Sequence, residues 1–175
     1  MKNIAVIIAF REFRDIEYFI PRDILIGAGF KIFNVSTKKG VAIGADGGEV
    51  DVDLTPDEFR PEGFDAAVFI GGPGMAKNLD NKDFQKIARD MARTGKVLGA
   101  ICIAPALLAK AGVLKGKKAV VWSNPMEKSA IKILGDNGAN YQEGKLAVDG
   151  NIVTASGPDA AEEFAQALTR LLTGK

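Results

Sequence analysis

The sequence predicts an α/β protein whose mainly parallel sheet is covered by helices on both faces. Three apolar runs of strand length, residues 3–10, 65–70 and 97–101, have almost no polar positions, so we expect strands that are buried on both faces. Segments with helical periodicity separate these runs, and an alternation of strands and helices is typical of parallel sheets. Because we find no linker, repeat or low-complexity tract, we expect one domain over residues 1–175.

The first helix is expected directly after the first strand and a short charged break. Ile16, Ile20 and Ile24 fall on one helical face, and the helix should end near Gly27. Pro21 either kinks this helix or opens its second part.

The middle of the chain contains a hairpin signal and a second helix pattern. Residues 30–35 read as a strand, and residues 41–53 alternate around Asp46-Gly47-Gly48, which predicts a small antiparallel side ribbon. After the buried strand 65–70, the apolar positions between Phe84 and Ala92 have the spacing of a helix that packs on one side.

The C-terminal part repeats the two patterns. Strands are expected over residues 97–101, 118–122, 146–148 and 152–155, and helices over residues 106–111, 126–134 and from Pro158 onward. Asp149-Gly150 reads as the turn of a hairpin near the sheet edge.

The composition excludes several classes of function. With 47% hydrophobic and 26% charged residues, the chain resembles an ordinary globular protein, and its net charge of +1 gives no argument for nucleic acid or a membrane as partner. It has one cysteine and no histidine, so Cys–His and Ser–His–Asp arrangements are excluded, and we expect no metal and no cofactor. A signal peptide is not evident, and the expected location is cytoplasmic.

The single cysteine occupies the position where open α/β sheets place their chemistry. Cys102 follows the buried run 97–101 and precedes Pro105, which suits the first turn of a helix. The N–H groups and the dipole at a helix start favour a thiolate. The alternative is a buried structural cysteine, because free cysteine packs as a small apolar residue. The sharp strand-to-helix turn, which resembles a nucleophile elbow, keeps the functional interpretation open.

Two further segments of this sheet edge are candidates for the same site. Gly71-Gly72-Pro73-Gly74 fits neither a dinucleotide fingerprint nor a P-loop, but its bare N–H groups suit an oxyanion hole; the alternative is a tight turn. Glu12 and Glu17 belong to the first strand–helix connection. A carboxyl beside the sulfur in an apolar pocket should have a raised pKa, whereas the alternative is two solvated charges.

Residues that follow the later strands are further candidates for the pocket. Ser123-Asn124 follows the strand expected at 118–122 and is predicted to line the pocket through Asn124. Ser156 follows the last strand and is either a pocket residue or a helix cap. Trp122 is expected in the core.

The chain resembles the ThiJ/PfpI superfamily, the group of the parkinsonism-associated protein deglycase, along essentially its whole length. The resemblance rests on the spacing of Glu17 to Pro21 and on Asp51-Val-Asp53-Leu, Phe69-Ile-Gly-Gly72, Ala100-Ile-Cys102-Ile-Ala-Pro105 and the segment 107–116. It implies a flavodoxin-like three-layer sandwich related to class I glutamine amidotransferases, and a homodimer built on exposed apolar residues of the first helix.

The resemblance also implies roles for individual residues. Cys102 matches the elbow nucleophile, Glu17 the protonated carboxyl beside it, and Gly72 and Ile103, with Gly71, the oxyanion-binding backbone. Family activities include the conversion of glyoxal and methylglyoxal to hydroxy acids, protein deglycation, peptidase activity, chaperone holding and redox sensing.

The positions at which this sequence differs from the family pattern indicate which of these activities to expect. The peptidase branch has a histidine where Ile103 stands, and the deglycase branch has a histidine near Asn124 and an arginine where Ser156 stands. We therefore expect an enzyme that acts on small reactive carbonyls through Cys102, with Glu17 as proton shuttle. The alternative is a redox or stress sensor or chaperone that uses an oxidisable Cys102, with a small oxidant as its partner. A peptidase is disfavoured because histidine is missing.

Overall fold

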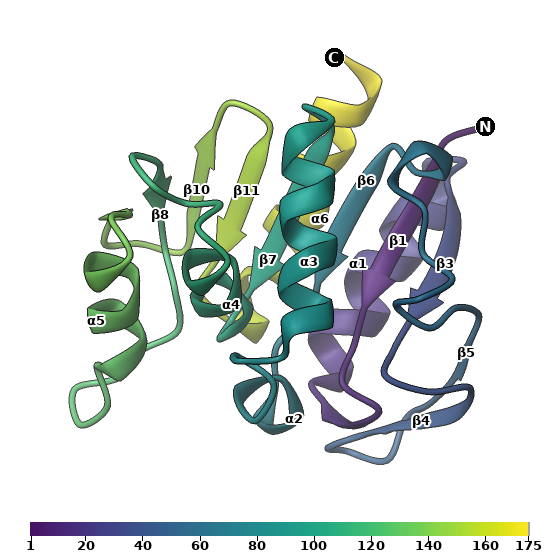
Figure 1. The fold of residues 1–175 in the computed structure, drawn as a ribbon, viewed down its shortest axis with the longest axis horizontal. Coiled ribbons are helices and arrows are strands. Elements are labelled where there is room, and N and C mark those ends of the chain that lie inside the picture. Colours follow the sequence, from purple (N-terminus) through teal and green to yellow (C-terminus); the bar gives the residue numbers. More distant parts are fainter. Residues whose placement is uncertain (175) are drawn as a thin grey trace.

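A computed structural model describes residues 1–174, within which six strands form a sheet between two layers of helices (Figure 1). In spatial order, the strands are β10 (Leu146–Asp149), β11 (Ile152–Ala155), β7 (Val97–Ile101), β6 (Ala66–Phe69), β1 (Asn3–Ile7) and β3 (Lys31–Val35). All neighbours pair in parallel except β10 and β11. The predicted, mainly parallel sheet is confirmed.

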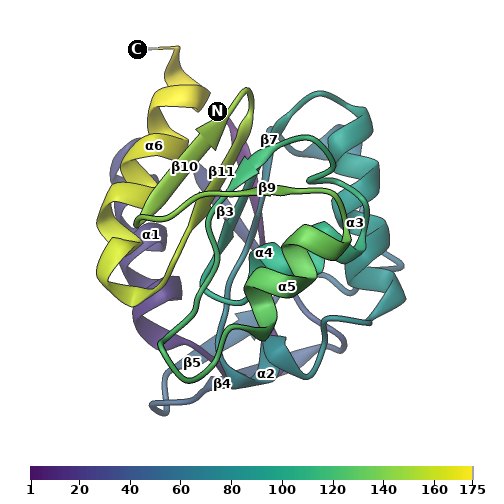
Figure 2. The ribbon, with the colours of Figure 1, turned by 90° about the vertical axis from the view of Figure 1, so that its left-hand side faces the viewer.

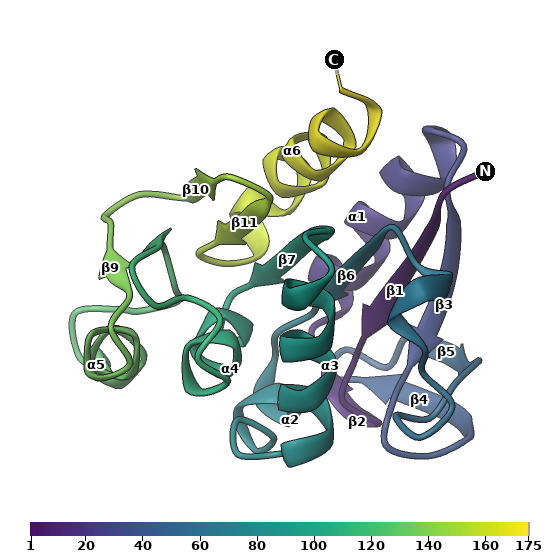
Figure 3. The ribbon, with the colours of Figure 1, turned by 45° about the horizontal axis from the view of Figure 1, so that its top comes forward.

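The helices cover both faces of this sheet, as predicted. One face carries α1 (Asp15–Gly27) and α6 (Ala161–Thr173); the other carries α3 (Lys82–Arg93), α4 (Ala104–Lys110) and α5 (Ser129–Asp136) (Figure 2). Figure 3 shows the same two rows of helices with the strands between them. Alternate residues of β1 supply the two cores: Ile4 and Val6 face one layer, and Ala5 and Ile7 face the other.

The side ribbon is present beside the carboxyl ends of the strands. β4 (Gly40–Gly44) and β5 (Glu49–Val52) form the predicted antiparallel hairpin. A third strand, β2 (Arg11–Phe13), pairs in parallel with β4 where the sequence indicated only a charged break. The buried carboxylate of Asp15 accepts hydrogen bonds from the N–H groups of Asp46 (2.8 Å) and Gly48 (2.7 Å), which ties the hairpin to the start of α1.

Helix α1 continues through its proline. Pro21 is buried inside the helix, and because it has no N–H, it cannot donate to the carbonyl of Glu17 four residues earlier. The shared face of Ile16 and Ile20 points outward, since these side chains are 47% and 39% exposed. The helix is therefore held on the sheet by another face, which includes Tyr18 and Leu25.

Two predicted elements near residue 120 have different bounds. The strand expected at 118–122 is limited to β8 (Lys118–Ala119), which pairs with β9 (Asn140–Tyr141). Beyond it, the Val120 N–H donates to Thr154 Oγ1 instead of a strand carbonyl. The helix expected at 126–134 begins at Ser129, because Asn124 Oδ1 accepts from two successive N–H groups, 126 and 127, and holds a turn there.

Three short helical segments complete the chain. They are η1 (Pro61–Gly63), α2 (Pro73–Ala76) and η2 (Pro158–Ala160), and each begins with a proline. The final helix, predicted from Pro158, starts as this 3-10 turn and continues as α6. None of the helices within residues 1–174 combines the length and apolar composition needed to cross a bilayer.

Candidate active site

Cys102 forms the sharp turn between β7 and α4. Its φ is +63°, a left-handed conformation that is strained for an L-amino acid. Two hydrogen bonds hold the turn: the Cys102 N–H donates to the carbonyl of Ala155 (2.9 Å), and the Trp122 N–H donates to the carbonyl of Cys102 (2.8 Å). The elbow predicted from the sequence is present, and its side chain is 8% exposed.

Glu17 lies in the first turn of α1 and brings a buried carboxyl to the cysteine. The Gly71 N–H donates to Glu17 Oε2 (3.0 Å), whereas Oε1 is buried with no hydrogen-bond partner among residues 1–174. Burial raises the pKa of Glu17 to about 7, although interactions with the Cys102 side chain, the Gly71 N–H and the Arg14 charge act in the opposite direction. This is the direction that the sequence predicted for a carboxyl in an apolar pocket.

The Cys102 thiol is held neutral by the same burial. Loss of solvent and the adjacent Glu17 carboxyl raise the pKa of Cys102, while the N–H groups of Ile103 and Gly72 lower it. The helix start therefore acts in the predicted direction, but burial outweighs it. The pKa of Cys102 therefore lies above its ordinary value, because a buried carboxyl beside a buried thiol disfavours two neighbouring negative charges.

The glycines after β6 are required by close approach. A Cβ at Gly71 would lie 2.6 Å from Cys102 Cβ and 2.7 Å from Glu17 Oε2, so any side chain there would separate the pair. Gly72 has φ +110°, and a Cβ on it would lie 2.5 Å from the backbone nitrogen of Arg14. The two glycines thus bring backbone N–H groups to the carboxyl and the sulfur, as an oxyanion hole needs.

A cavity of about 230 Å³ opens at the cysteine. It is lined by Arg14, Gly72, Pro73, Ala76, Cys102, Ile103 and Trp122. The sequence predicted Cys102, Gly72 and Ile103 here, but it missed Arg14 and placed Trp122 in the core. The sequence contains only weak signals that these two residues line the cavity. Arg14 stands three residues before Glu17, and Trp122 directly precedes the Ser123-Asn124 segment that is predicted to line the pocket.

Three predicted pocket residues lie outside this lining. Glu12 forms an exposed ion pair with Lys77 (2.5 Å). The side-chain oxygen of Asn124, Oδ1, accepts the hydrogen bonds of the turn before α5. Ser156 lines a neighbouring cavity of about 380 Å³ that shares Trp122 with the cysteine cavity. Chain position put all three at the correct edge of the sheet, but the direction of each side chain depends on tertiary contacts.

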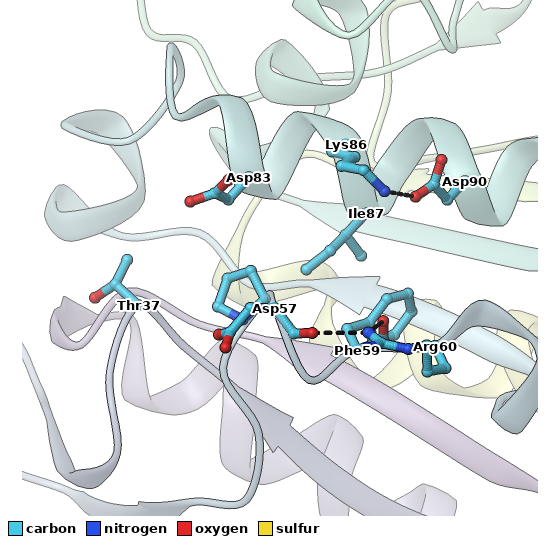
Figure 4. Close-up of a pocket in the computed structure, with 9 residues that line it drawn as sticks. Thr37, Asp57, Phe59, Arg60, Asp83, Lys86, Ile87 and Asp90 are labelled. Carbon is cyan, nitrogen blue, oxygen red and sulfur yellow. Dashed lines mark hydrogen bonds and ion pairs between the residues drawn. The ribbon is translucent and has the colours of Figure 1, made fainter.

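A further cavity, of about 320 Å³, lies between α3 and residues 56–60 (Figure 4). Both of its cationic side chains have partners: Lys86 pairs with Asp90 (2.5 Å), and Arg60 donates to the carbonyl of Asp57 (2.7 Å). It contains no nucleophilic thiol. Within residues 1–174, no three Cys, Asp or Glu side chains lie together as a metal site would require.

A central parallel strand that ends in a strained cysteine, with a buried carboxyl alongside, defines the class of flavodoxin-like proteins with a cysteine elbow. The chain belongs to the DJ-1/PfpI family, whose model matches residues 2–171. Deglycase PfpI of Pyrococcus furiosus is 35% identical over 164 residues, which cover 92% of this chain and 94% of that protein.

Two other comparisons agree. Protein MJ0967 of Methanocaldococcus jannaschii is 38% identical over 167 residues, which cover 94% of this chain and 80% of that protein. The crystal structure of a ThiJ/PfpI domain protein from Brachyspira murdochii superposes with a TM-score of 0.92 at 30% identity, covering 99% of this chain and 97% of that one. The resemblance found in the sequence and the flavodoxin-like fold are both confirmed.

Proposed function

We propose that this protein converts small reactive carbonyl compounds to hydroxy acids through Cys102. The observation that carries the proposal is Cys102 in the lining of an open cavity with the buried Glu17 carboxyl beside it. A group with a pKa of about 7 is half ionised near neutral pH, so Glu17 is suited both to accept and to donate a proton. Relatives named as deglycases support the same class of chemistry.

The reaction begins with addition of the cysteine to an aldehyde. As sulfur bonds to the aldehyde carbon of methylglyoxal, the thiol proton passes to Glu17 and on to the carbonyl oxygen, which gives a hemithioacetal. The Gly72 and Ile103 N–H groups stabilise negative charge on that oxygen. The C1 hydrogen then moves as a proton to C2 through an enediol, giving a thioester of lactate. Water hydrolyses the thioester and restores the thiol, so the net reaction adds one water.

Turnover of methylglyoxal tests the proposal. Wild type in an amine-free buffer should form lactate in excess of enzyme, Cys102→Ser should reduce the rate to that of buffer, and Glu17→Gln should lower kcat about 10²–10⁴-fold because it removes the proton shuttle. Glu163→Gln, an exposed glutamate of α6, is the matched control and should leave the rate unchanged. Absence of lactate above the buffer rate in wild type would contradict the proposal.

A redox sensor is the second candidate, because two backbone N–H groups and a carboxyl oxygen with no hydrogen-bond partner among residues 1–174 surround the sulfur. The N–H groups of Gly72 and Ile103, together with a protonated Glu17 Oε1, would hold the oxygens of a Cys102 sulfinic acid. Mild peroxide should then add two oxygens to the protein mass, and the addition should be absent in Cys102→Ser. Peroxide-stable Cys102 would exclude this function. A peptidase remains disfavoured for want of a histidine.

A further inference from the structure

The lining of the cysteine cavity contains a single charged side chain, Arg14. The other lining residues are Gly72, Pro73, Ala76, Cys102, Ile103 and Trp122, so Arg14 brings the positive charge to an otherwise uncharged lining. Arg14 is half-buried, and within residues 1–174 its guanidinium makes no ion pair and no hydrogen bond. A partly desolvated guanidinium that makes no ion pair favours binding of an anion, and its charge also acts on the nearby Glu17 carboxyl, whose pKa it lowers.

The position of Arg14 is fixed by its backbone. Its N–H donates to the carbonyl of Gly71 (3.0 Å), and its own carbonyl accepts from Tyr18 (3.2 Å) in the first turn of α1. The same glycine donates to the Glu17 carboxyl. The loop at Gly71 therefore connects the backbone of Arg14, the Glu17 carboxyl and the oxyanion-binding N–H groups beside the Cys102 sulfur.

We propose that Arg14 makes the cavity a subsite for carboxylates, so that the carbonyl substrate of Cys102 carries a carboxylate group. This inference rests on the proposed function only in taking Cys102 as the group that meets the substrate. The guanidinium fork matches a carboxylate with two parallel hydrogen bonds. A cavity of about 230 Å³ accommodates a small aldehyde acid, with its carboxylate at Arg14 and its carbonyl at the sulfur.

Alkylation of Cys102 tests the subsite without requiring turnover. Iodoacetate and iodoacetamide have nearly the same shape, and with each the sulfur bonds to the CH₂ carbon as iodide leaves; only the charge differs. Because the chain has one cysteine, intact mass reports each reaction unambiguously. The quantity measured is the ratio of the two rate constants, iodoacetate over iodoacetamide, in which any change in thiol pKa cancels.

The folded protein should show a ratio about 10-fold above that of the urea-unfolded chain, as expected for one charge-assisted contact. Arg14→Gln should return the ratio to the unfolded value, and Arg14→Lys should retain part of the preference, since it keeps the charge but loses the fork. Arg93→Gln, which makes the same charge change at an exposed position at the far end of α3, should behave as wild type.

A second arm uses an aldehyde. Glyoxylate, which carries a carboxylate beside its aldehyde, should protect Cys102 from iodoacetamide at concentrations about 10-fold lower than acetaldehyde does, and Arg14→Gln should remove this difference. Equal ratios in wild type and Arg14→Gln would overturn the proposal. So would failure of both reagents to label the folded protein, because the cavity would then not admit such molecules. Loss of turnover with the alkylation preference intact would contradict the proposed function and leave the subsite standing.

Discussion

Glu17 couples the chemistry of the site to the stability of the fold. Its pKa rises from 4.5 to about 7 on folding, mainly through burial. The folded state therefore binds the proton more tightly than the unfolded chain, and the unfolding free energy must fall as the pH rises between these two values. At 1.36 kcal/mol per pKa unit, the loss is about 3 kcal/mol, present in full above pH 7 and absent below pH 4.5.

Glu17→Gln should remove this dependence, because an amide does not ionise. Urea unfolding at pH 4.5, 6 and 7.5 should show wild type losing about 2–3 kcal/mol relative to the variant across the series. Glu163→Gln is again the control, since its exposed carboxyl should leave the wild-type slope intact. Parallel pH profiles for wild type and Glu17→Gln would show that the carboxyl stays ionised in the fold.

At this scale, the sequence predicted Cys102 and Glu17 as neighbours but not the whole lining. Cys102 could be placed because it ends a buried strand and precedes a helix start, whereas the residues alone left Glu12 and Glu17 open, and only the family resemblance, through the spacing to Pro21, singled out Glu17. Arg14 could not, because nothing local distinguishes a charged loop residue that points into a cavity from one in water. Its backbone is held by Gly71, which is distant in sequence but donates to Glu17 and accepts from Arg14.

The β4–β5 hairpin positions the helix that carries Glu17, and Asp15 is the connection. Both hydrogen bonds from the hairpin end on its carboxylate. Gly44 and Gly48 are shaped around it, since a Cβ on either would lie within 2.3–2.4 Å of a carboxyl oxygen. Thus a ribbon with no part in the cavity lining supports the start of α1.

Asp15→Ala should destabilise the protein by about 2–4 kcal/mol, because the N–H groups of Asp46 and Gly48 lose the buried, charged acceptor of two partly buried hydrogen bonds. The measurement is urea unfolding at pH 7.5, with methylglyoxal turnover as a second readout for the displaced Glu17. Asp23→Ala, which removes an exposed carboxylate of the same helix, should change stability by less than about 0.5 kcal/mol. Equal effects of the two substitutions would contradict the role of Asp15 in anchoring the hairpin to α1.

Among the elements, those with a strong apolar period were predicted and those defined by side-chain contacts were not. The buried strands β1, β6 and β7 follow directly from their residues. Residues 120–122 have strand propensity, yet the Val120 N–H donates to Thr154 Oγ1 and the Trp122 N–H to the Cys102 carbonyl. Propensity is local, whereas these partners come from β11 and the elbow, so no pattern in residues 118–122 could have shortened the strand.

At the scale of the whole molecule, the outer face of α1 is the surface on which we expect a homodimer to form. Ile16 and Ile20 remain exposed on a helix that packs on the sheet through another face. Wild type should sediment as a dimer at micromolar concentration, and the double substitution Ile16→Asp, Ile20→Asp should weaken association about 100-fold, because two apolar contacts are replaced by repelling charges. Met126→Asp, at an exposed apolar residue in a loop, is the control. A monomeric wild type would contradict the prediction.

The hydrogen bond from Cys102 to Ala155 has a consequence for synthesis of the chain. The elbow is translated well before β11, the strand whose carbonyl holds it, and at about 5–20 residues per second several seconds separate the two. During that interval, the nascent chain has the elbow residues without the neighbour that fixes their strained backbone. The hydrogen bond that anchors the Cys102 N–H can therefore form only after β11 has been made, so the elbow is completed late in synthesis.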